Sequence, residues 1–121
     1  KDEKLVIAGG WRPGWSTDFC ATLLAEDYSI PVVINLSNID KVYDKDPNKF
    51  ADAKPIDHMT WDEIIAIVGD KWTPGLNMPF DPIAAAKAKE IGLKVIIING
   101  RNFENFNNVL EGREFVGTVI E

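Results

Sequence analysis

A glycine-rich turn near the start of the chain carries residue types that bind anions. Residues 9–16 (GGWRPGWS) nearly match the P-loop spacing G-x-x-x-x-G-K-[ST], but Trp15 stands where a P-loop has lysine, so we reject the P-loop itself. A glycine turn that leads from a strand into a helix still presents free N–H groups to an anion. Arg12 could add a bidentate phosphate contact, and Trp11 and Trp15 offer faces on which a base could stack. The alternative is a tight structural turn with two buried tryptophans, because GG and PG pairs also mark ordinary turns.

Two aspartates, Asp18 and Asp81, each follow a loop that contains glycine or proline and stand at or near a helix N-terminus. As a first-turn acid and an N-cap they would stabilise those helices. As a pair on the ligand side of the fold they would orient Mg²⁺ or charged groups around a transferring phosphoryl group. Their spacing in the sequence leaves both interpretations open.

Apolar runs that alternate with capped helical segments position these residues. The pattern predicts buried strands at 5–8, 31–36 and 94–99, a final strand at 115–120, and helices at 17–27, 60–68, 82–91 and 102–110. The first strand, helix and second strand make a βαβ unit with a right-handed crossover. Residues 37–55 and 72–80 are predicted to be irregular. The alternation predicts an α/β fold, a three-layer αβα arrangement around a mostly parallel sheet, with ligands beyond the carboxyl ends of the strands.

Composition narrows the class of protein. The 121 residues, 45% hydrophobic and 26% charged, fit one globular domain, and no apolar run approaches the ~20 residues of a membrane span. The net charge of −6 argues against nucleic acid or an anionic membrane as partner. The single Cys20 and single His58 exclude a disulfide framework and a structural zinc site. With no signal peptide in view, we expect a cytoplasmic protein; a chain that begins at Lys1 could be the back half of something longer.

Four segments, in order, resemble the C-terminal half of the bacterial and archaeal uridylate (UMP) kinases of the amino acid kinase family. They are GGWRPGWSTD (9–18), NLSNIDKVYDKDP (35–47), MPFDPIAAAKA (78–88) and FVGTVIE (115–121). Lys41 and Asp44 depart from the glycine and threonine that are usual in the family. The resemblance implies that residues 1–121 form a single amino acid kinase-like domain portion, the nucleotide-side C-terminal lobe. The N-terminal lobe, with the lysine that contacts the transferring phosphoryl group, lies outside this sequence.

The resemblance also implies an activity and its residues. The γ-phosphoryl group of ATP, bound with Mg²⁺, would pass in line to UMP and give UDP, a step of pyrimidine nucleotide biosynthesis that is catalysed mainly by positioning and charge stabilisation. Asp18 and Asp81 would be the catalytic acids, and no residue is assigned as a metal ligand. The partners would be UMP and ATP, and the assembly a hexamer. The residues implied to bind UMP are Gly10, Trp11, Arg12, Pro13, Gly14, Trp15, Ser16 and Thr17, and those implied to bind ATP are Ser37, Tyr43 and Asp46.

Two other interpretations stay open. The chain could belong to a family member with another acceptor, such as a carbamate, acetylglutamate or aspartate kinase, or it could be a non-catalytic nucleotide-binding regulatory module. For a chain that lacks the N-terminal half of the family, we expect the 121 residues alone to bind nucleotide weakly and to transfer little or nothing. The reason is that part of the charge stabilisation on which transfer depends would come from the other half.

Overall fold

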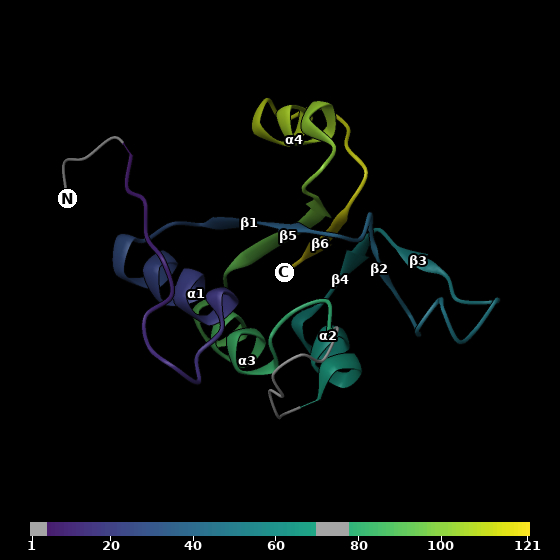
Figure 1. Ribbon diagram of the computed structural model, residues 1–121, viewed down its shortest axis with the longest axis horizontal. Coiled ribbons are helices and arrows are strands. Elements are labelled where there is room, and N and C mark those ends of the chain that lie inside the picture. The colour runs from purple at the N-terminus through teal and green to yellow at the C-terminus, as the bar shows by residue number, and fades with distance from the viewer. Residues whose placement is uncertain (1–4, 70–77) are drawn as a thin grey trace.

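A four-stranded sheet forms the centre of the computed structural model, which describes residues 5–69 and 78–121 (Figure 1). The strand order is β1-β5-β6-β4. β1 (Val32–Ser37) runs parallel to β5 (Lys94–Asn99), β5 antiparallel to β6 (Thr118–Ile120), and β6 parallel to β4 (His58–Met59). Two parallel junctions and one antiparallel junction make the sheet mostly parallel, as the sequence predicts. A separate antiparallel ribbon pairs β2 (Val42–Tyr43) with β3 (Pro55–Ile56).

Helices cover both faces of the sheet and make three layers. α1 (Thr17–Tyr28), α2 (Trp61–Val68) and α3 (Pro82–Ile91) lie on one face, and α4 (Phe103–Leu110) lies on the other (Figure 1). Their starts are set by local capping. The hydroxyl of Ser16 accepts from the N–H of Phe19, and Thr60 opens α2 with a capping box. Asp81 caps α3 ahead of proline at its first position, as predicted.

The core lies between the sheet and the three-helix face. α3 presents three alanines, Ala84, Ala85 and Ala88, all fully buried, and such small side chains let it pack closely between α1 and α2. Larger apolar side chains from the strands fill the other side, among them Val95, Ile97 and Ile120. Among the helices of residues 5–69 and 78–121, none has the length and hydropathy that crossing a membrane requires.

The predicted buried strand at 5–8 is wrong. Residues 5–8 form no strand, and Leu5 and Ile7 are 78% and 90% exposed. An apolar run becomes a buried strand only when it pairs and both of its faces are covered. Within the described residues β1 pairs with β5 alone, and Val6 and Ala8 instead line an apolar hollow of about 490 Å³ against α1. The predicted βαβ unit and its right-handed crossover are therefore not formed.

The remaining differences concern short or edge elements. The strand predicted at 31–36 lies at 32–37 and is only partly buried, because β1 is at the edge of the sheet. The irregular segment 37–55 contains the β2–β3 ribbon, and the strand predicted at 115–120 is limited to β6. β4 was not predicted, because two residues are too few for a periodic signal. Most of the predicted irregular segment 72–80, namely 72–77, lies outside the described residues.

Candidate active site

The N-termini of α1 and α3 are fastened to each other by side chains from both helices. The hydroxyl of Ser16, the cap of α1, donates a hydrogen bond to the carboxylate of Asp81, the cap of α3. In the other direction, the backbone N–H of Asp81 donates to Oδ2 of Asp18 at 3.1 Å. The two aspartates that the sequence singles out, 63 residues apart, are thus brought together.

Hydrogen bonds engage every oxygen of these two carboxylates. Oδ1 of Asp81 accepts from the N–H groups of Ile83 (2.6 Å) and Ala84 (3.2 Å), and Oδ2 accepts from Ser16. Oδ1 of Asp18 accepts from the side-chain amide of Asn35 at 3.1 Å, and Oδ2 accepts from Asp81. Because the positive ends of two helix dipoles meet here, two acidic groups can lie side by side in a partly buried place.

Burial sets the acidity of Asp18. Loss of solvent raises the pKa of its carboxyl group above the ordinary value of 3.8, and the neighbouring charge of Asp81 raises it further. The hydrogen bonds from the Asp81 N–H and from Asn35 act against this rise without cancelling it. A carboxyl group whose pKa is perturbed by burial and by a charged neighbour is a feature of functional sites as well as of structural networks.

A hollow of about 220 Å³ opens beside Asp18, at the start of α1 and along β1. Its polar lining comes from Thr17, Asp18 and Asn35, and Phe80 closes it from the α3 side. The hollow extends along β1 from Val33 to Leu36, toward the carboxyl end of the strand, the end near which α/β sheets bind ligands. The residues that line it are Thr17, Asp18, Ala21, Val33, Ile34, Asn35, Leu36 and Phe80.

The glycine-rich turn is exposed and carries an aromatic stack. Trp11 and Trp15 are 55% and 38% exposed, so the alternative of a turn with two buried tryptophans is wrong. The guanidinium of Arg12 lies 3.8 Å from the ring centroid of Trp11, whose ring is 6.1 Å from that of Trp15. Trp15 in turn stacks on Phe19 of α1 at 4.6 Å, which holds the turn against the helix. The positive φ of Gly14, +90°, explains the glycine at that position.

The eight residues predicted to bind UMP, 10–17, therefore divide in two. Ser16 and Thr17 belong to the joined helix starts and the hollow, whereas residues 10–15 form the exposed turn that precedes them. Of the eight, only Thr17 lines the hollow, and the role of the group in binding UMP stays a prediction.

The three residues predicted to bind ATP lie along the next segment and do not line the hollow. Ser37 ends β1, and its carbonyl accepts from the N–H of Gly100 at 2.8 Å. Tyr43 is in β2. The side chain of Asp46 accepts from the N–H of Asn48 at 2.9 Å and so shapes the turn between β2 and β3. Their role stays a prediction.

Sequence reasoning missed two residues of the site, Asn35 and Phe80. Asn35 is an amide near the end of an otherwise apolar strand, and that polar interruption was the available signal. Phe80 immediately precedes the helix cap Asp81, and only the packing of α3 against α1 reveals its place. Across residues 5–69 and 78–121, no three His, Cys, Asp or Glu side chains gather in a way that could hold a metal ion.

Comparison with known proteins identifies the class. The model of the amino acid kinase family matches residues 2–99, and the chain belongs to that family. Among its relatives are uridylate kinases. That of Methanobrevibacter smithii is 39% identical over 118 residues, which cover 97% of this chain and 52% of the relative. That of Thermoplasma volcanium is 38% identical over 119 residues, which cover 98% of this chain and 52% of the relative. The crystal structure of the uridylate kinase of Archaeoglobus fulgidus matches with a TM-score of 0.77 and 35% identity, over 93% of this chain and 50% of that one. The chain thus spans about half the length of these relatives. The UMP kinase of Bacillus anthracis, 19% identical with a TM-score of 0.75 over 91% of this chain and 42% of that one, supports the fold alone.

Proposed function

We propose that this chain supplies the nucleotide-side half of a UMP kinase, which transfers the γ-phosphoryl group of ATP to UMP and gives UDP. The observation that carries the proposal is the joined pair of helix N-termini, with Asp18 facing a hollow at the carboxyl half of β1. Relatives named uridylate kinase support the choice of acceptor. A cytoplasmic location, a hexameric assembly and a role in pyrimidine nucleotide biosynthesis belong to the same proposal.

In this proposal the main role of this half is to position the phosphate groups of the two nucleotides. The N–H groups at the start of α1 and the guanidinium of Arg12 would hold phosphate oxygens, since a helix start favours negative charge. Asp81 fixes the start of α3 and, through Ser16, the start of α1. Asp18 would orient the reacting phosphoryl region from the wall of the hollow. Phosphoryl transfer needs little covalent help from a protein, so such an arrangement suits it.

Mg²⁺ enters this proposal as part of the ATP substrate. Every oxygen of Asp18 and Asp81 already accepts a hydrogen bond, and the described residues offer no cluster of ligands for a dedicated ion site. Mg²⁺ usually keeps several waters and binds through substrate phosphates with one or two carboxylates, so these residues fit an ion that the triphosphate brings.

The two nucleotides would take different places. Uracil would stack on the exposed ring of Trp11 or Trp15, in the turn that leads into α1. The adenosine of ATP would lie against Ser37, Tyr43 and Asp46.

Calorimetric titration of the chain with UMP, CMP, aspartate and Mg-ATP tests the proposal. We expect saturable UMP binding, weaker CMP binding and no heat from aspartate. Arg12→Ala should weaken UMP binding about tenfold, a loss of ~1.4 kcal/mol, whereas Arg113→Ala, a matched loss of one exposed arginine after α4, should not. Binding of aspartate would point to an amino acid acceptor, and binding of ATP alone to a regulatory module.

A turnover assay tests the expected weakness of the isolated chain. We expect little or no UDP from ATP and UMP, because the other half of the kinase would contribute part of the charge stabilisation. A turnover of ~1–100 s⁻¹, the usual range of kinases, would overturn that expectation.

A further inference from the structure

One buried hydroxyl joins the β2–β3 ribbon to the sheet. Thr118 of β6 is fully buried, and its Oγ1 accepts from the backbone N–H of Val42 at 2.8 Å. The same oxygen donates to the backbone carbonyl of Ile56 at 2.6 Å. Val42 and Ile56 stand directly opposite each other in the ribbon. A single side chain therefore contacts both strands of the ribbon at one pair of residues.

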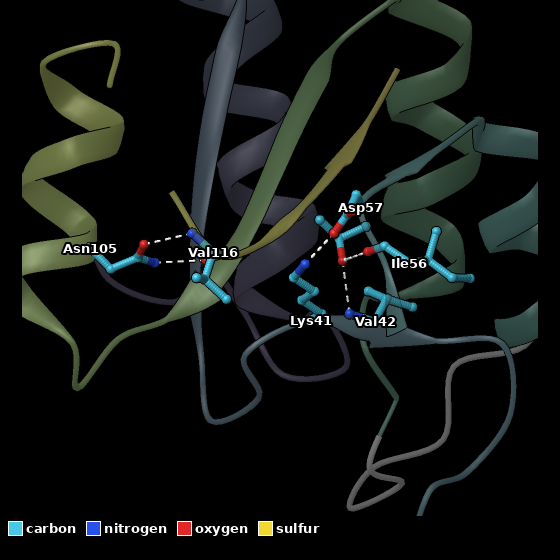
Figure 2. Close-up of polar contacts among 7 residues, drawn as sticks. Lys41, Val42, Ile56, Asp57, Asn105 and Val116 are labelled. Atoms are coloured by element: carbon cyan, nitrogen blue, oxygen red, sulfur yellow. Dashed lines mark hydrogen bonds and ion pairs between the residues drawn. The ribbon is translucent and has the colours of Figure 1, made fainter. Parts of the chain in front are cut away.

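The other contacts at this junction hold mainly β3. The N–H of Val119 donates to the carbonyl of Asp57, just after β3, at 2.9 Å. On the β2 side, Lys41 pairs with Asp57, but the side chain of Asp57 is 82% exposed, and exposed ion pairs contribute little (Figure 2). β2 is also paired with β3, and the side chain of Asn99 in β5 donates to Asp40, just before β2, at 2.9 Å in an exposed hydrogen bond. Among the described residues, the threonine hydroxyl is thus the principal buried polar attachment of β2 to the sheet, and β3 keeps a backbone attachment without it.

The position of Thr118 is itself tightly determined. The side-chain amide of Asn105 in α4 holds the backbone of Val116 on both sides: its Nδ2 donates to the carbonyl and its Oδ1 accepts from the N–H, each at 2.7 Å (Figure 2). At Gly117 a Cβ atom would lie 2.6 Å from the carbonyl oxygen of Ile97, so only glycine allows this close approach. The contacts of Val116 and Gly117 thus fix the backbone just before Thr118, independently of its hydrogen bonds to the ribbon.

The ribbon carries residues that the proposed function assigns to ATP. Tyr43 follows Val42 directly in β2, and Asp46 shapes the turn beyond it. We propose that Thr118 is a positioning residue for ATP: its hydroxyl fixes β2, and thereby Tyr43 and Asp46, without contacting the nucleotide. This inference rests on the proposed function only for the identity of the ligand. The fastening of β2 by Thr118 is a separate claim and is tested separately.

The variants Thr118→Val and Thr118→Ser test the role of the Thr118 hydroxyl. Valine keeps the shape of threonine and removes the hydroxyl, whereas serine keeps the hydroxyl. Thr60→Val is the matched control, because it removes the capping hydroxyl of α2 and destabilises the chain away from the ribbon. Site-resolved amide hydrogen exchange and NMR titration with Mg-ATP and with UMP are measured on the same samples of the chain.

In Thr118→Val we expect exchange of the Val42 amide to accelerate at least tenfold, while the Val119 amide, which donates to Asp57, stays protected. The Kd for Mg-ATP should rise about tenfold, equivalent to ~1.4 kcal/mol, and the Kd for UMP should stay the same. Thr118→Ser should match the wild type within about twofold, and Thr60→Val should leave both Val42 exchange and ATP binding unchanged.

The outcomes separate the two claims. Unchanged Val42 exchange in a folded Thr118→Val chain would overturn the fastening, and faster Val42 exchange with unchanged ATP affinity would overturn the role in ATP binding. Equal losses of ATP and UMP affinity, or a loss in Thr118→Ser as large as in Thr118→Val, would show a merely structural threonine and overturn it too. If the wild-type chain binds UMP but not ATP, the assignment of the ribbon to ATP fails, while the exchange data still decide the fastening.

Discussion

Replacing Asp81 by alanine should cost the chain a large share of its stability. The side chain is only 4% exposed and accepts three hydrogen bonds, from the N–H groups of Ile83 and Ala84 and from the hydroxyl of Ser16. Loss of a helix cap costs about 1 kcal/mol. Leaving buried donors without a partner costs about 1–3 kcal/mol. Because the two effects overlap, we expect a total loss of about 2–3 kcal/mol in the free energy of unfolding, out of the ~5–15 kcal/mol that is usual for a domain.

Asp81→Asn separates the hydrogen bonds from the charge. Its side-chain oxygen can still accept from Ile83 and Ala84, so most of the cap remains. The charge that raises the pKa of Asp18 is gone, and this relief offsets part of what is lost. We therefore expect Asp81→Asn to cost roughly half as much as Asp81→Ala or less, about 1 kcal/mol.

Urea unfolding measures both losses. With a slope of about 2 kcal/mol per M, the midpoint should fall by about 1–1.5 M in Asp81→Ala. Asp62→Ala is the control, because Asp62 is an acid in the first turn of α2 whose side chain is 76% exposed. The free energy of unfolding of Asp62→Ala should differ from that of the wild type by no more than about 0.5 kcal/mol. If the midpoint of Asp81→Ala stays within about 0.2 M of the wild type, the three hydrogen bonds are not made in solution, and the argument for joined helix starts fails with them.

Three further perturbations test other parts of the structure. Because folding raises the pKa of Asp18 above 3.8, the folded state holds the proton more tightly. The contribution of this group to stability is full below that value and is lost as pH rises through the folded pKa. Asp18→Asn should therefore reduce the pH dependence of stability in urea above pH 3.8 and be no less stable than the wild type at neutral pH. Gly117→Ala should destabilise the chain by about 1–3 kcal/mol in thermal unfolding, since its Cβ would lie 2.6 Å from the Ile97 carbonyl oxygen. UMP should quench tryptophan fluorescence, and the double variant Trp11→Phe/Trp15→Phe should remove much of that response, because both rings are exposed whereas Trp61 is buried. An undiminished response in the double variant would exclude stacking on either ring.

Helix starts were predictable because capping is local. Thr60 and Glu63 are three residues apart, and the capping box that they form is complete within that span. Asp81 followed by Pro82, with Gly92 at the other end, likewise fixes α3 from its own sequence. In such cases the interacting groups are close in the chain, so their types and spacing determine the geometry.

Strand pairing and the contacts of the site were harder to predict, because they depend on residues far apart in the chain. The apolar run at 5–8 has the composition of a buried strand, yet pairing decides whether it becomes one, and it does not pair here. The hydrogen bond between Asp18 and the N–H of Asp81 spans 63 residues and follows only from the packing of α1 beside α3. Asn35 reaches Asp18 for the same reason: its place in an apolar strand marks it as unusual, but only the fold shows which group it contacts.

Asp18 and Asp81 differ in what their carboxylates contact, and this predicts different roles for them. The family resemblance implies that both are catalytic acids, but of the two only Asp18 lines the hollow. Asp81 directs its two oxygens to the N–H groups of its own helix and to Ser16, so its carboxylate is occupied in holding the two helix starts together. Asp18 has a raised pKa and is the acidic side chain among those that line the hollow, so under the proposed function it is the acid nearest to a bound phosphate group. It follows that Asp18→Asn should impair nucleotide binding or transfer while sparing the fold, whereas Asp81→Asn should weaken both together, and parallel urea and UMP titrations of the two variants would reveal this division.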